Sequence, residues 1–313
     1  MKTDIIIIGG PTAVGKTRTS IEMAKRFNGE VISADSMQIY KGLDIGSAKA
    51  TPEEVGDIPH HLLSIVEPTD EYSAAEWYEA AKAAIEDIAS RGKTPIIVGG
   101  TGLYINTLLY EMDFHEAEAD LEFRAEMESL AKVEGNEAVH KILYDLDQSE
   151  AERIHPNNLK RVIRAIEINR MTGEEKKAFK TEPKENPHFN PVLIGLTGNR
   201  KKLYARINKR VDLMVDLGLL EEVKNLKEHY DLDDSFQSMK GIGYKEVLGY
   251  LEGRYDLDIM LSVLKQSSRR YAKRQMTWFR RYANLKWFDV DVEKDFDVLL
   301  DNIENYIKTQ IKR

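Results

Sequence analysis

The sequence predicts an α/β fold, in which a parallel-sheet core with helices on both faces carries an all-helical insertion. Short runs of β-branched residues recur through the first hundred residues, separated by stretches of helical periodicity. This alternation is typical of parallel sheets that are covered on both faces. From Asp120 to Met171 the periodicity is helical throughout, and strand character returns at Pro191–Thr197. We therefore expect a core of residues 1–113 and 191–313 and an insertion of residues 114–190.

Length and composition indicate a soluble globular protein. The chain has 313 residues, which is enough for one large domain or two modest ones. Charged residues make up 31% and apolar residues 42%, and no apolar run approaches the roughly 20 residues that a membrane span needs. There is no cysteine, which excludes disulfides and thiolate zinc sites. We expect a cytoplasmic protein without a membrane partner.

The net charge of −8 hides an uneven distribution. Residues 111–153 contain 14 acidic and four basic residues, whereas residues 265–288 contain eight Lys or Arg and no Asp or Glu. Nucleic-acid binders are often basic overall, so the total weighs against that class. Because salt screening makes binding local, the basic segment matters more than the total.

The first strands and helices follow from their residue types. Ile5–Gly9 is a buried strand, and a helix follows from Thr17 to Phe27. A second strand, Glu30–Asp35, ends on a carboxylate, and His61–Val66 is a candidate third strand. Ser73 and Glu76 form a capping box that begins a helix reaching Arg91, where Gly92 stops it. Thr94–Gly99 is a further buried strand with a glycine-rich exit turn.

The remainder is mostly helical. Within the insertion the clearest helix is Asn157–Met171, which Gly173 ends, and residues 174–190 form a polar, proline-containing loop. After the strand Pro191–Thr197, the periodicity predicts the helices Lys201–Leu217, Leu219–Tyr230, Tyr244–Glu252 and a basic helix Leu257–Tyr282. A last short strand at Lys286–Asp289 precedes a terminal amphipathic helix.

One motif identifies an anion site. Between the first strand and the first helix, the chain fits G-x-x-x-x-G-K-[ST], the P-loop pattern, at every fixed position. Its glycines let successive N–H groups point into one concavity, and the following helix adds its positive end. Lys16 reaches outer phosphate oxygens, and the Thr17 hydroxyl is placed to ligate Mg²⁺. The motif's residues are Gly10, Pro11, Thr12, Ala13, Val14, Gly15, Lys16 and Thr17.

A P-loop specifies what is bound and leaves the reaction open. The commonest use is phosphoryl transfer from ATP, but the cradle can also hold the diphosphate leaving group of a substrate cleaved at carbon–oxygen. The strand Thr94–Gly99 ends in glycine, where many nucleotide hydrolases place a Mg²⁺-binding Asp. A carboxylate instead follows the second strand, at Asp35, which we expect beside the cradle. Asp35 is either a general base or an ordinary turn cap.

Several stretches, in order along the chain, resemble the tRNA dimethylallyltransferase family, the tRNA isopentenyltransferases. They are GPTAVGKT at Gly10–Thr17, ADSMQIYKGLDIGSAK at Ala34–Lys49, His60-His61, GGTGLY at Gly99–Tyr104, HPNNLKRVIRAIE at His155–Glu167, GIGYKE at Gly241–Glu246 and AKRQMTWFR at Ala272–Arg280. The resemblance extends from Ile5 to about Phe288. A zinc finger that some eukaryotic members carry needs cysteine, so this chain is similar to the shorter bacterial type.

The resemblance implies a reaction. The family transfers the dimethylallyl group of dimethylallyl diphosphate to N6 of the adenosine just 3′ of the anticodon in certain tRNAs, and it releases diphosphate with Mg²⁺ as cofactor. The implied partners are the anticodon stem-loop of tRNA and dimethylallyl diphosphate. Nothing in the sequence suggests more than a monomer.

The resemblance also implies roles for residues. The P-loop, with Thr12, Lys16 and Thr17 foremost, would hold the diphosphate. Asp35 would take the proton of the attacking amine, Thr101 would contact the adenine or the diphosphate, and Arg210 would neutralise charge on the leaving group. Arg206 shares a helix face with Arg210. For Arg206 we favour an ordinary solvated position with an acidic partner.

Implied RNA contacts form a larger set. The adenosine must leave the base stack to reach a pocket. Basic residues would hold the anticodon arm, and in Lys265–Arg281 aromatic residues alternate with cations, a pattern suited to phosphate contact and base stacking, although we expect Trp278 and Phe279 to lie mostly in the core. The implied tRNA-binding residues are Asp35, Ser36, Met37, Gln38, Thr101, Arg124, Lys160, Arg161, Val162, Ile163, Arg164, Lys240, Gly241, Ile242, Gly243, Tyr244, Lys245, Lys273 and Arg274.

Two other classes are weighed against prenyl transfer. The P-loop alone is compatible with an ATP-dependent small-molecule kinase, which would consume ATP and transfer phosphate. A nucleotide-binding switch has little support, because the sequence lacks the N-K-x-D guanine-reading motif.

Overall fold

The chain divides into two compact units. A computed structural model describes residues 2–112, 120–172, 184–292 and 295–311. The first unit comprises Met1–Tyr110 and Asn186–Arg313, and the second comprises Glu111–Glu185. The predicted insertion, residues 114–190, both starts and ends a few residues later in the chain than this second unit. Gly173 and most of the loop predicted at residues 174–190 lie outside the described residues.

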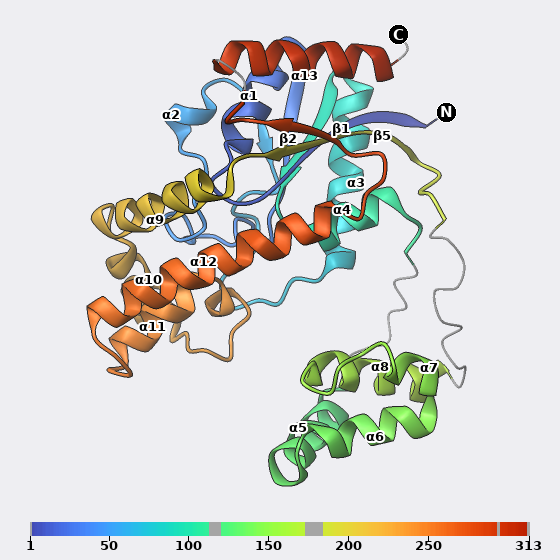
Figure 1. Cartoon of the computed structure of the whole chain (residues 1–313), viewed down its shortest axis with the longest axis vertical. Coiled ribbons are helices and arrows are strands. Elements are labelled where there is room, and N and C mark those ends of the chain that lie inside the picture. The colour runs from blue at the N-terminus through green and yellow to red at the C-terminus, as the bar shows by residue number, and fades with distance from the viewer. Residues whose placement is uncertain (1, 113–119, 173–183, 293–294, 312–313) are drawn as a thin grey trace. The chain divides into compact units, whose positions relative to one another are not determined.

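The first unit is built on a six-stranded sheet in which every pairing is parallel, so the α/β prediction is confirmed (Figure 1). The strand order is β3-β2-β4-β1-β5-β6. The strands are β1 (Thr3–Gly9), β2 (Gly29–Ala34), β3 (His60–His61), β4 (Thr94–Gly99), β5 (Phe189–Thr197) and β6 (Lys286–Asp289). The third strand is shorter than the predicted His61–Val66, and Val66 forms only an isolated bridge with Tyr40.

The start of β5 corrects a predicted boundary. We expected the strand to begin at Pro191, but it begins at Phe189 and pairs with β1 from that residue. Proline lacks a backbone N–H and is tolerated where a neighbouring strand is absent. The other neighbour, β6, pairs with β5 only from Ile194 onward, so Pro191 lies where that side of the strand is open.

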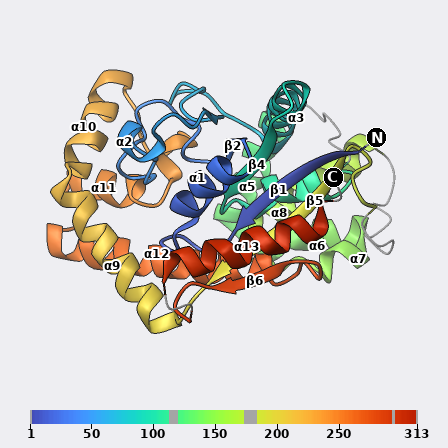
Figure 2. The same cartoon turned by 90° about the horizontal axis from the view of Figure 1, so that it is seen from above.

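The strand Ile5–Ile8 shows how the sheet is covered on both faces. All four isoleucines are buried, and successive side chains point to opposite faces. Ile5 and Ile7 pack with the face that α3 (Ala74–Ser90) and α4 (Gly102–Leu109) cover. Ile6 and Ile8 pack with α1 (Lys16–Arg26) and α13 (Phe296–Gln310). Figure 2 shows α1 and α13 side by side over one face.

A helical layer follows β5 and completes the first unit. It contains α9 (Arg200–Asp216), α10 (Leu219–Tyr230), the 3-10 turn η1 (Ser238–Lys240), α11 (Tyr244–Leu251) and α12 (Leu257–Phe279); α2 (Pro52–Val55) precedes β3. The long helix α12 packs against α9, α11 and α4 (Figure 1). This places α12 against the helix that begins where β4 ends.

The second unit is helical, as predicted. It contains α5 (Leu121–Glu134), α6 (Asn136–Leu146), α7 (Gln148–Ala151) and α8 (Leu159–Thr172), and no strand is found among its described residues. Its own core includes Phe123, Val139, Leu143, Val162 and Ile166. None of the helices in the described part of the chain combines the length and apolar character of a membrane span.

Of the histidine pair, His61 takes part in a hydrogen-bond network near the amino end of β2. His61 Nε2 lies 2.8 Å from Glu30 Oε2, and Glu30 is only 2% exposed. Arg91 and Lys93 also donate to this carboxylate, and their hydrogen bonds hold the pKa of Glu30 well below its ordinary value. The network therefore joins β2, β3 and the end of α3, away from the carboxyl ends of the strands.

Candidate active site at the carboxyl edge of the sheet

Three segments of the predicted site meet where the central strands end. The P-loop follows β1, Thr101 follows β4, and Asp35 follows β2. The carboxyl ends of parallel strands lie at one edge of a sheet, which is where α/β proteins bind ligands. We had expected Asp35 to lie beside the P-loop. Because β4 lies between β1 and β2, the strand before Asp35 is instead separated from the P-loop strand by β4. The turn with Thr101 lies between them.

The P-loop has the backbone conformation that its glycines allow. Gly15, at the start of α1, has φ +99°, and no side chain caps the helix. The first N–H groups of α1 therefore have no partner within the helix and are available to an anion. At Gly10 a Cβ would lie 2.6 Å from the backbone oxygen of Leu196, so a larger residue would clash with β5. Ala13 is also left-handed, with φ +60°.

Lys16 lies inside this loop. Its Nζ donates to the carbonyl oxygens of Gly10 (3.0 Å) and Pro11 (2.8 Å). Burial lowers the pKa of Lys16 to about 8, while Asp35 raises it and Arg210 lowers it. These electrostatic effects show that Asp35 and Arg210 both lie close enough to influence the P-loop lysine.

A side chain from α12 joins the P-loop to the β4 turn. Gln275 is 4% exposed, and its Oε1 accepts a hydrogen bond from Thr12 N at 2.8 Å. Its Nε2 donates to the carbonyl oxygen of Gly100 at 3.2 Å. A Cβ at Gly100 would lie 1.9 Å from that nitrogen, so glycine is required for the approach. The Thr12 N–H is thus used by Gln275, and the cradle relies on the amides that follow.

Tyr271, one helical turn before Gln275, lies on the same side of α12. Its hydroxyl lies close to the side chains of Thr101 and Gln275. Burial raises the pKa of Tyr271 well above its ordinary value, and nearby Asp35 raises it further, so the hydroxyl stays protonated. Thr101 also accepts a hydrogen bond from Ser36 N at 3.1 Å.

Asp35 has two distinct oxygens. Oδ1 accepts hydrogen bonds from Met37 N (2.9 Å) and Gln38 N (3.4 Å), which is the turn-capping role that we weighed from the sequence. Oδ2 accepts no hydrogen bond from any residue that the structure describes. The cap therefore fixes the carboxylate and leaves one oxygen free to accept a proton.

Helix α9 supplies two arginines with different contacts. Arg206 pairs with Asp291 at 2.8 Å, the acidic partner that we expected. Its Nε also donates to the carbonyl oxygen of Ala13 at 3.2 Å, so it supports the P-loop as well. Arg210 is exposed, yet the protein around its guanidinium lowers its pKa. No ion pair of Arg210 is found among the described residues, so its charge is available to an anion.

The segment Ser36–Gln38 is half-buried, and the predicted RNA contacts at residues 240–245 divide by exposure. Lys240 and Lys245 are exposed, and Ile242 is half-buried. Gly241, Gly243 and Tyr244 are buried, which corrects the expectation that these three line an RNA surface. Tyr244 is fully buried, with 0% exposure.

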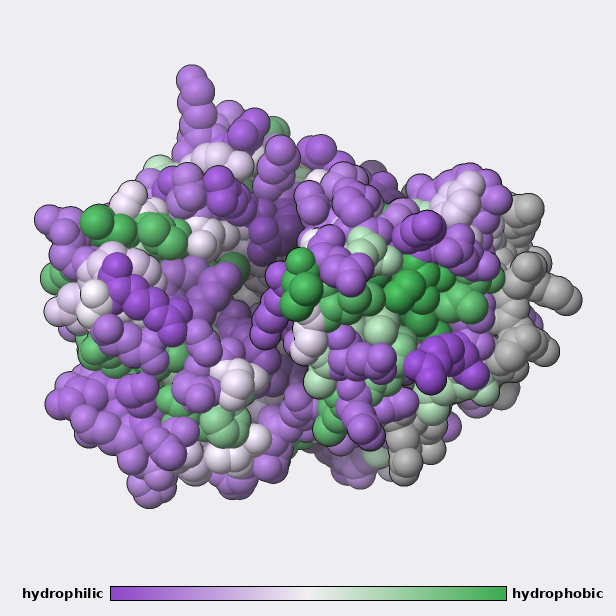
Figure 3. All heavy atoms as spheres, turned by 90° about the horizontal axis from the view of Figure 1, so that it is seen from below, coloured by the Kyte–Doolittle hydropathy of each residue, from purple (hydrophilic) through white to green (hydrophobic). Residues whose placement is uncertain are grey.

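A basic surface runs along α12. The predicted residues Lys273 and Arg274 are exposed and line a groove with neighbouring side chains. Trp278 lies half-buried against Gly102, and Phe279 is 1% exposed, so the aromatic residues pack inward as expected. Figure 3 shows one face of the molecule, on which hydrophilic residues predominate and hydrophobic ones gather in patches. The groove residues are Arg270, Lys273, Arg274, Thr277, Trp278 and Arg281.

The other predicted RNA contacts belong to the second unit. Lys160 and Arg161 are exposed on α8. Arg124 and Arg164 are half-buried and both donate to Glu167, which is 1% exposed. Val162 and Ile163 are buried in the unit's core, which corrects the expectation that their side chains contact RNA.

The donor set for a metal ion is small. Among the described residues, no group of three or more His, Asp or Glu side chains could hold a metal. Mg²⁺ commonly completes its shell with waters and substrate phosphates. A site formed by the half-buried Thr17, in the first turn of α1, and diphosphate oxygens fits that chemistry.

Sequence reasoning missed two residues of the site. Gln275 and Tyr271 were seen only as parts of a basic, aromatic stretch. Gln275 follows Tyr271 by four residues, and Trp278 and Tyr282 follow at three and four more; these are the spacings of one helix face and could have identified them. Arg206 was assigned an acidic partner correctly, but its contact with the P-loop could not be predicted.

Comparison with known proteins identifies relatives over the whole chain. The family model described as IPP transferase matches residues 38–282. The tRNA dimethylallyltransferase of Alkaliphilus metalliredigens is 48% identical over 98% of this chain and 99% of its own. That of Alkaliphilus oremlandii is 52% identical over 93% of this chain and 92% of its own.

Two solved structures are also similar to this chain. The tRNA isopentenylpyrophosphate transferase of Bacillus halodurans has a TM-score of 0.75 and 46% identity, covering 99% of this chain and 97% of its own. A eukaryotic dimethylallyltransferase acting on tRNA has a TM-score of 0.84 and 30% identity, covering all of this chain and 81% of its own. With the bacterial relatives matched over nearly their full length and the P-loop, Asp35 and Thr101 gathered at one sheet edge, the chain belongs to the tRNA dimethylallyltransferase family of IPP transferases.

Proposed function

We propose that this protein transfers the dimethylallyl group of dimethylallyl diphosphate to N6 of the adenosine 3′-adjacent to the anticodon in tRNA, and releases diphosphate. The observation that carries the proposal is the pairing of an anion cradle with a carboxylate that has one free oxygen, in a chain closely related to tRNA dimethylallyltransferases. The reaction needs both parts: one holds the leaving group, and the other accepts a proton.

The donor's diphosphate binds at the P-loop. The first N–H groups of α1 and the charge of Lys16 neutralise it. Lys16 exchanges its hydrogen bonds with Gly10 and Pro11 for phosphate oxygens. Arg210, whose charge also reaches this site, stabilises the charge that grows on the leaving group. Thr17 would hold Mg²⁺ together with the diphosphate, and the bound ion would supply further neutralisation of that charge.

The acceptor's amine needs a base, because its lone pair is delocalised into the adenine ring. Asp35 Oδ2 accepts the N6 proton as the bond between N6 and the donor's first carbon forms and the carbon–oxygen bond breaks. The hydrogen bonds to Oδ1 keep the carboxylate in place during this step. Thr101, which accepts a hydrogen bond from Ser36 N and lies near Tyr271, is between the two sides and contacts the adenine or the diphosphate.

We assign the tRNA contacts to residues whose side chains are exposed or half-buried. In the first unit these are Ser36–Gln38, Lys240, Lys245, Lys273 and Arg274, and in the second unit Arg124, Lys160, Arg161 and Arg164. A basic groove suits the phosphate backbone, whose contacts release counterions. The kinase alternative has no support from the relatives and solved structures described above, which are all transferases.

The direct test of this function is a transfer assay. Purified protein is incubated with Mg²⁺, dimethylallyl diphosphate and unmodified tRNA, and the digested nucleosides are weighed by mass spectrometry. We expect an adenosine heavier by one dimethylallyl group, formed without ATP and lost when EDTA removes the metal. ATP consumption with transfer of phosphate to a small molecule, and no prenylated adenosine, would favour the kinase instead.

The second prediction separates the two roles of Asp35. In Asp35→Asn the remaining side-chain oxygen can still cap Met37 and Gln38, but the amide cannot accept the proton. We expect kcat to fall by about 10²- to 10⁴-fold, with tRNA affinity in a filter-binding assay nearly unchanged. Asp35→Ala removes the cap as well and should also weaken tRNA binding. Near-normal turnover of Asp35→Asn would mean that Asp35 is not the base.

The third prediction concerns pH. In the protein without donor, Lys16 has a pKa of about 8, and a bound diphosphate raises that pKa. The affinity for the donor is therefore full below pH 8 and declines above it. Titration calorimetry with dimethylallyl diphosphate between pH 6.5 and 10 should show weakening of up to about tenfold per pH unit. Lys16→Met should bind about 10- to 100-fold more weakly and lose this inflection. An inflection that persists in Lys16→Met would assign it to another group.

A further inference from the structure

Residues 35–47 form a loop that returns from the carboxyl end of β2 and is fastened to the helical layer. Its first part contains Asp35 and the half-buried segment Ser36–Gln38, which the proposed function places at the acceptor adenosine. Its second part, Asp44–Gly46, presents three consecutive backbone N–H groups to α10. These N–H groups connect the carboxylate of Glu222, on α10, with the loop that carries the acceptor side of the site.

Glu222, on α10, receives all three amides. Its Oε2 accepts from Asp44 N (3.1 Å) and Ile45 N (2.7 Å), and its Oε1 accepts from Gly46 N (3.0 Å). The hydroxyl of Tyr244, on α11, donates to the same Oε1 at 2.7 Å. Both carboxylate oxygens are thus occupied by donors, which holds the loop to two helices.

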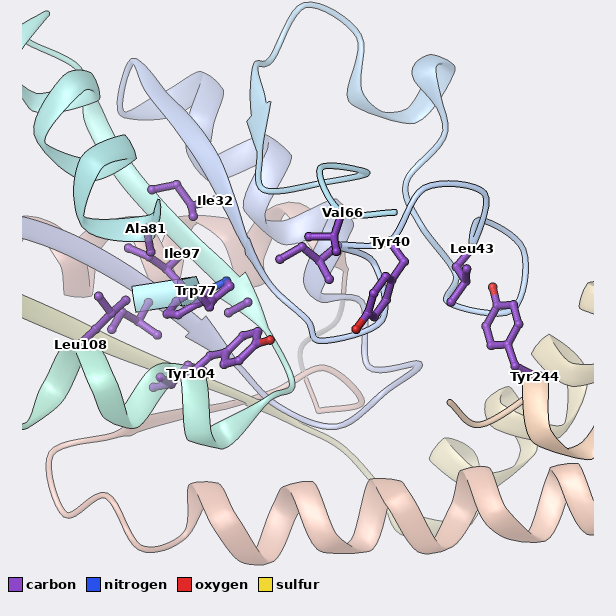
Figure 4. Close-up of a cluster of buried hydrophobic side chains, with 14 of the residues drawn as sticks. Ile32, Tyr40, Leu43, Val66, Trp77, Ala81, Ile97, Tyr104, Leu108 and Tyr244 are labelled. Atoms are coloured by element: carbon purple, nitrogen blue, oxygen red, sulfur yellow. The ribbon is translucent and has the colours of Figure 1, made fainter. Parts of the chain in front are cut away.

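The Tyr244 ring fits only because the loop has glycine at the contact. A Cβ at Gly46 would lie 2.6 Å from Tyr244 Cζ, although Gly46 itself has an ordinary backbone conformation. Figure 4 shows the ring pointing toward the loop beside Leu43. Burial, together with the negative charge of Glu222, raises the pKa of Tyr244 well above its ordinary value, so the hydroxyl remains a donor.

The same helix start also contacts the first part of the loop. A Cβ at Gly241 would lie 2.5 Å from Met37 Sδ, so Met37 packs directly on the segment before α11. Gln38 in turn donates through Nε2 to the carbonyl oxygens of Ser47 (3.2 Å) and Ala48 (3.3 Å). The loop therefore closes on itself and transmits the position of Asp44–Gly46 to Asp35–Gln38.

We propose that Glu222 and Tyr244 are positioning residues, which set the geometry of the Asp35–Gln38 segment for the acceptor adenosine without touching RNA. This inference rests on the proposed function. It gives the buried part of the Gly241–Glu246 stretch a task other than RNA contact. We call the contacts of Glu222 and Tyr244 with Asp44–Gly46 the clamp. Because the P-loop and Lys16 are not part of it, the proposal predicts that a weakened clamp affects tRNA and leaves the binding of dimethylallyl diphosphate unchanged.

The test compares Tyr244→Phe with a matched control. Tyr244→Phe removes one hydroxyl from Glu222 and keeps the ring, whereas Tyr255→Phe removes a hydroxyl that donates to the carbonyl oxygen of Glu246 at 2.8 Å, away from the loop. For Tyr244→Phe we expect kcat/KM for tRNA to fall by about tenfold, since a hydrogen bond to a charged group is lost. Affinity for dimethylallyl diphosphate, measured by calorimetry, should stay within about twofold, and Tyr255→Phe should leave both quantities unchanged within the same margin.

Hydrogen exchange measures the clamp independently of catalysis. The amides of Asp44, Ile45 and Gly46 should exchange faster in Tyr244→Phe, and faster still in Glu222→Gln, whose side-chain amide turns a donor toward donors. Gly46→Ala, which displaces the ring, should reproduce the kinetic effect of Tyr244→Phe. Unchanged exchange and unchanged tRNA kinetics in Tyr244→Phe would overturn the proposal, as would an equal loss of donor and tRNA affinity.

The two proposals fail in different ways. If the wild-type protein does not prenylate tRNA, the proposed function is refuted and the positioning role toward adenosine falls with it. If the wild type is active and Tyr244→Phe matches Tyr255→Phe in exchange and kinetics, only the positioning role is refuted.

Discussion

The geometry of the site depends on one buried side-chain amide. Gln275 accepts a hydrogen bond from the P-loop at Thr12 and donates one to the turn after β4 at Gly100. A buried amide that loses a partner leaves an unsatisfied polar group, which costs about 1–3 kcal/mol. The pairing therefore fixes α12 against the carboxyl edge of the sheet. The same placement brings Tyr271, on the same side of α12, close to Thr101.

Electrostatics then determine what the edge can do. The start of α1, Lys16 and Arg210 place positive charge on one side, and the Asp35 carboxylate lies on the other. Two opposing effects set the charge of Lys16: burial lowers its pKa to about 8, while the negative charge of Asp35 opposes that change. A diphosphate anion restores the lysine's preference for its charged form. A leaving group and a proton acceptor can therefore coexist within one small site.

The local parts of this description were predictable from the sequence. The P-loop and most of the strands follow from short-range patterns, because glycine placement and runs of Ile and Val determine backbone conformation locally. The strand order was not predictable, since nothing local reveals that β4 separates β1 from β2. The contacts of Gln275 with Thr12 and of Glu222 with Gly46 join residues far apart in the chain.

Burial explains the predictions that were wrong. Val162 and Ile163 lie in a basic stretch of α8, but they share the helix face that also carries Ile166 and faces the second unit's core. Their apolar type and helical spacing already indicated that face. Tyr244 gave no such signal, because its hydroxyl is satisfied by a carboxylate on another helix. A resemblance can assign a whole stretch of sequence to RNA binding. Only the packing in the structure distinguishes the residues that can contact RNA from those that hold them in place.

The most direct measurement of the central claim is a crystal structure with a non-reactive dimethylallyl diphosphate analogue, Mg²⁺ and an anticodon stem-loop. We predict diphosphate oxygens on the amides at the start of α1, Lys16 Nζ moved from the Gly10 and Pro11 carbonyls to phosphate, and adenosine N6 within about 3 Å of Asp35 Oδ2. A diphosphate bound away from the P-loop, or an adenosine whose N6 lies out of reach of Asp35, would contradict the account.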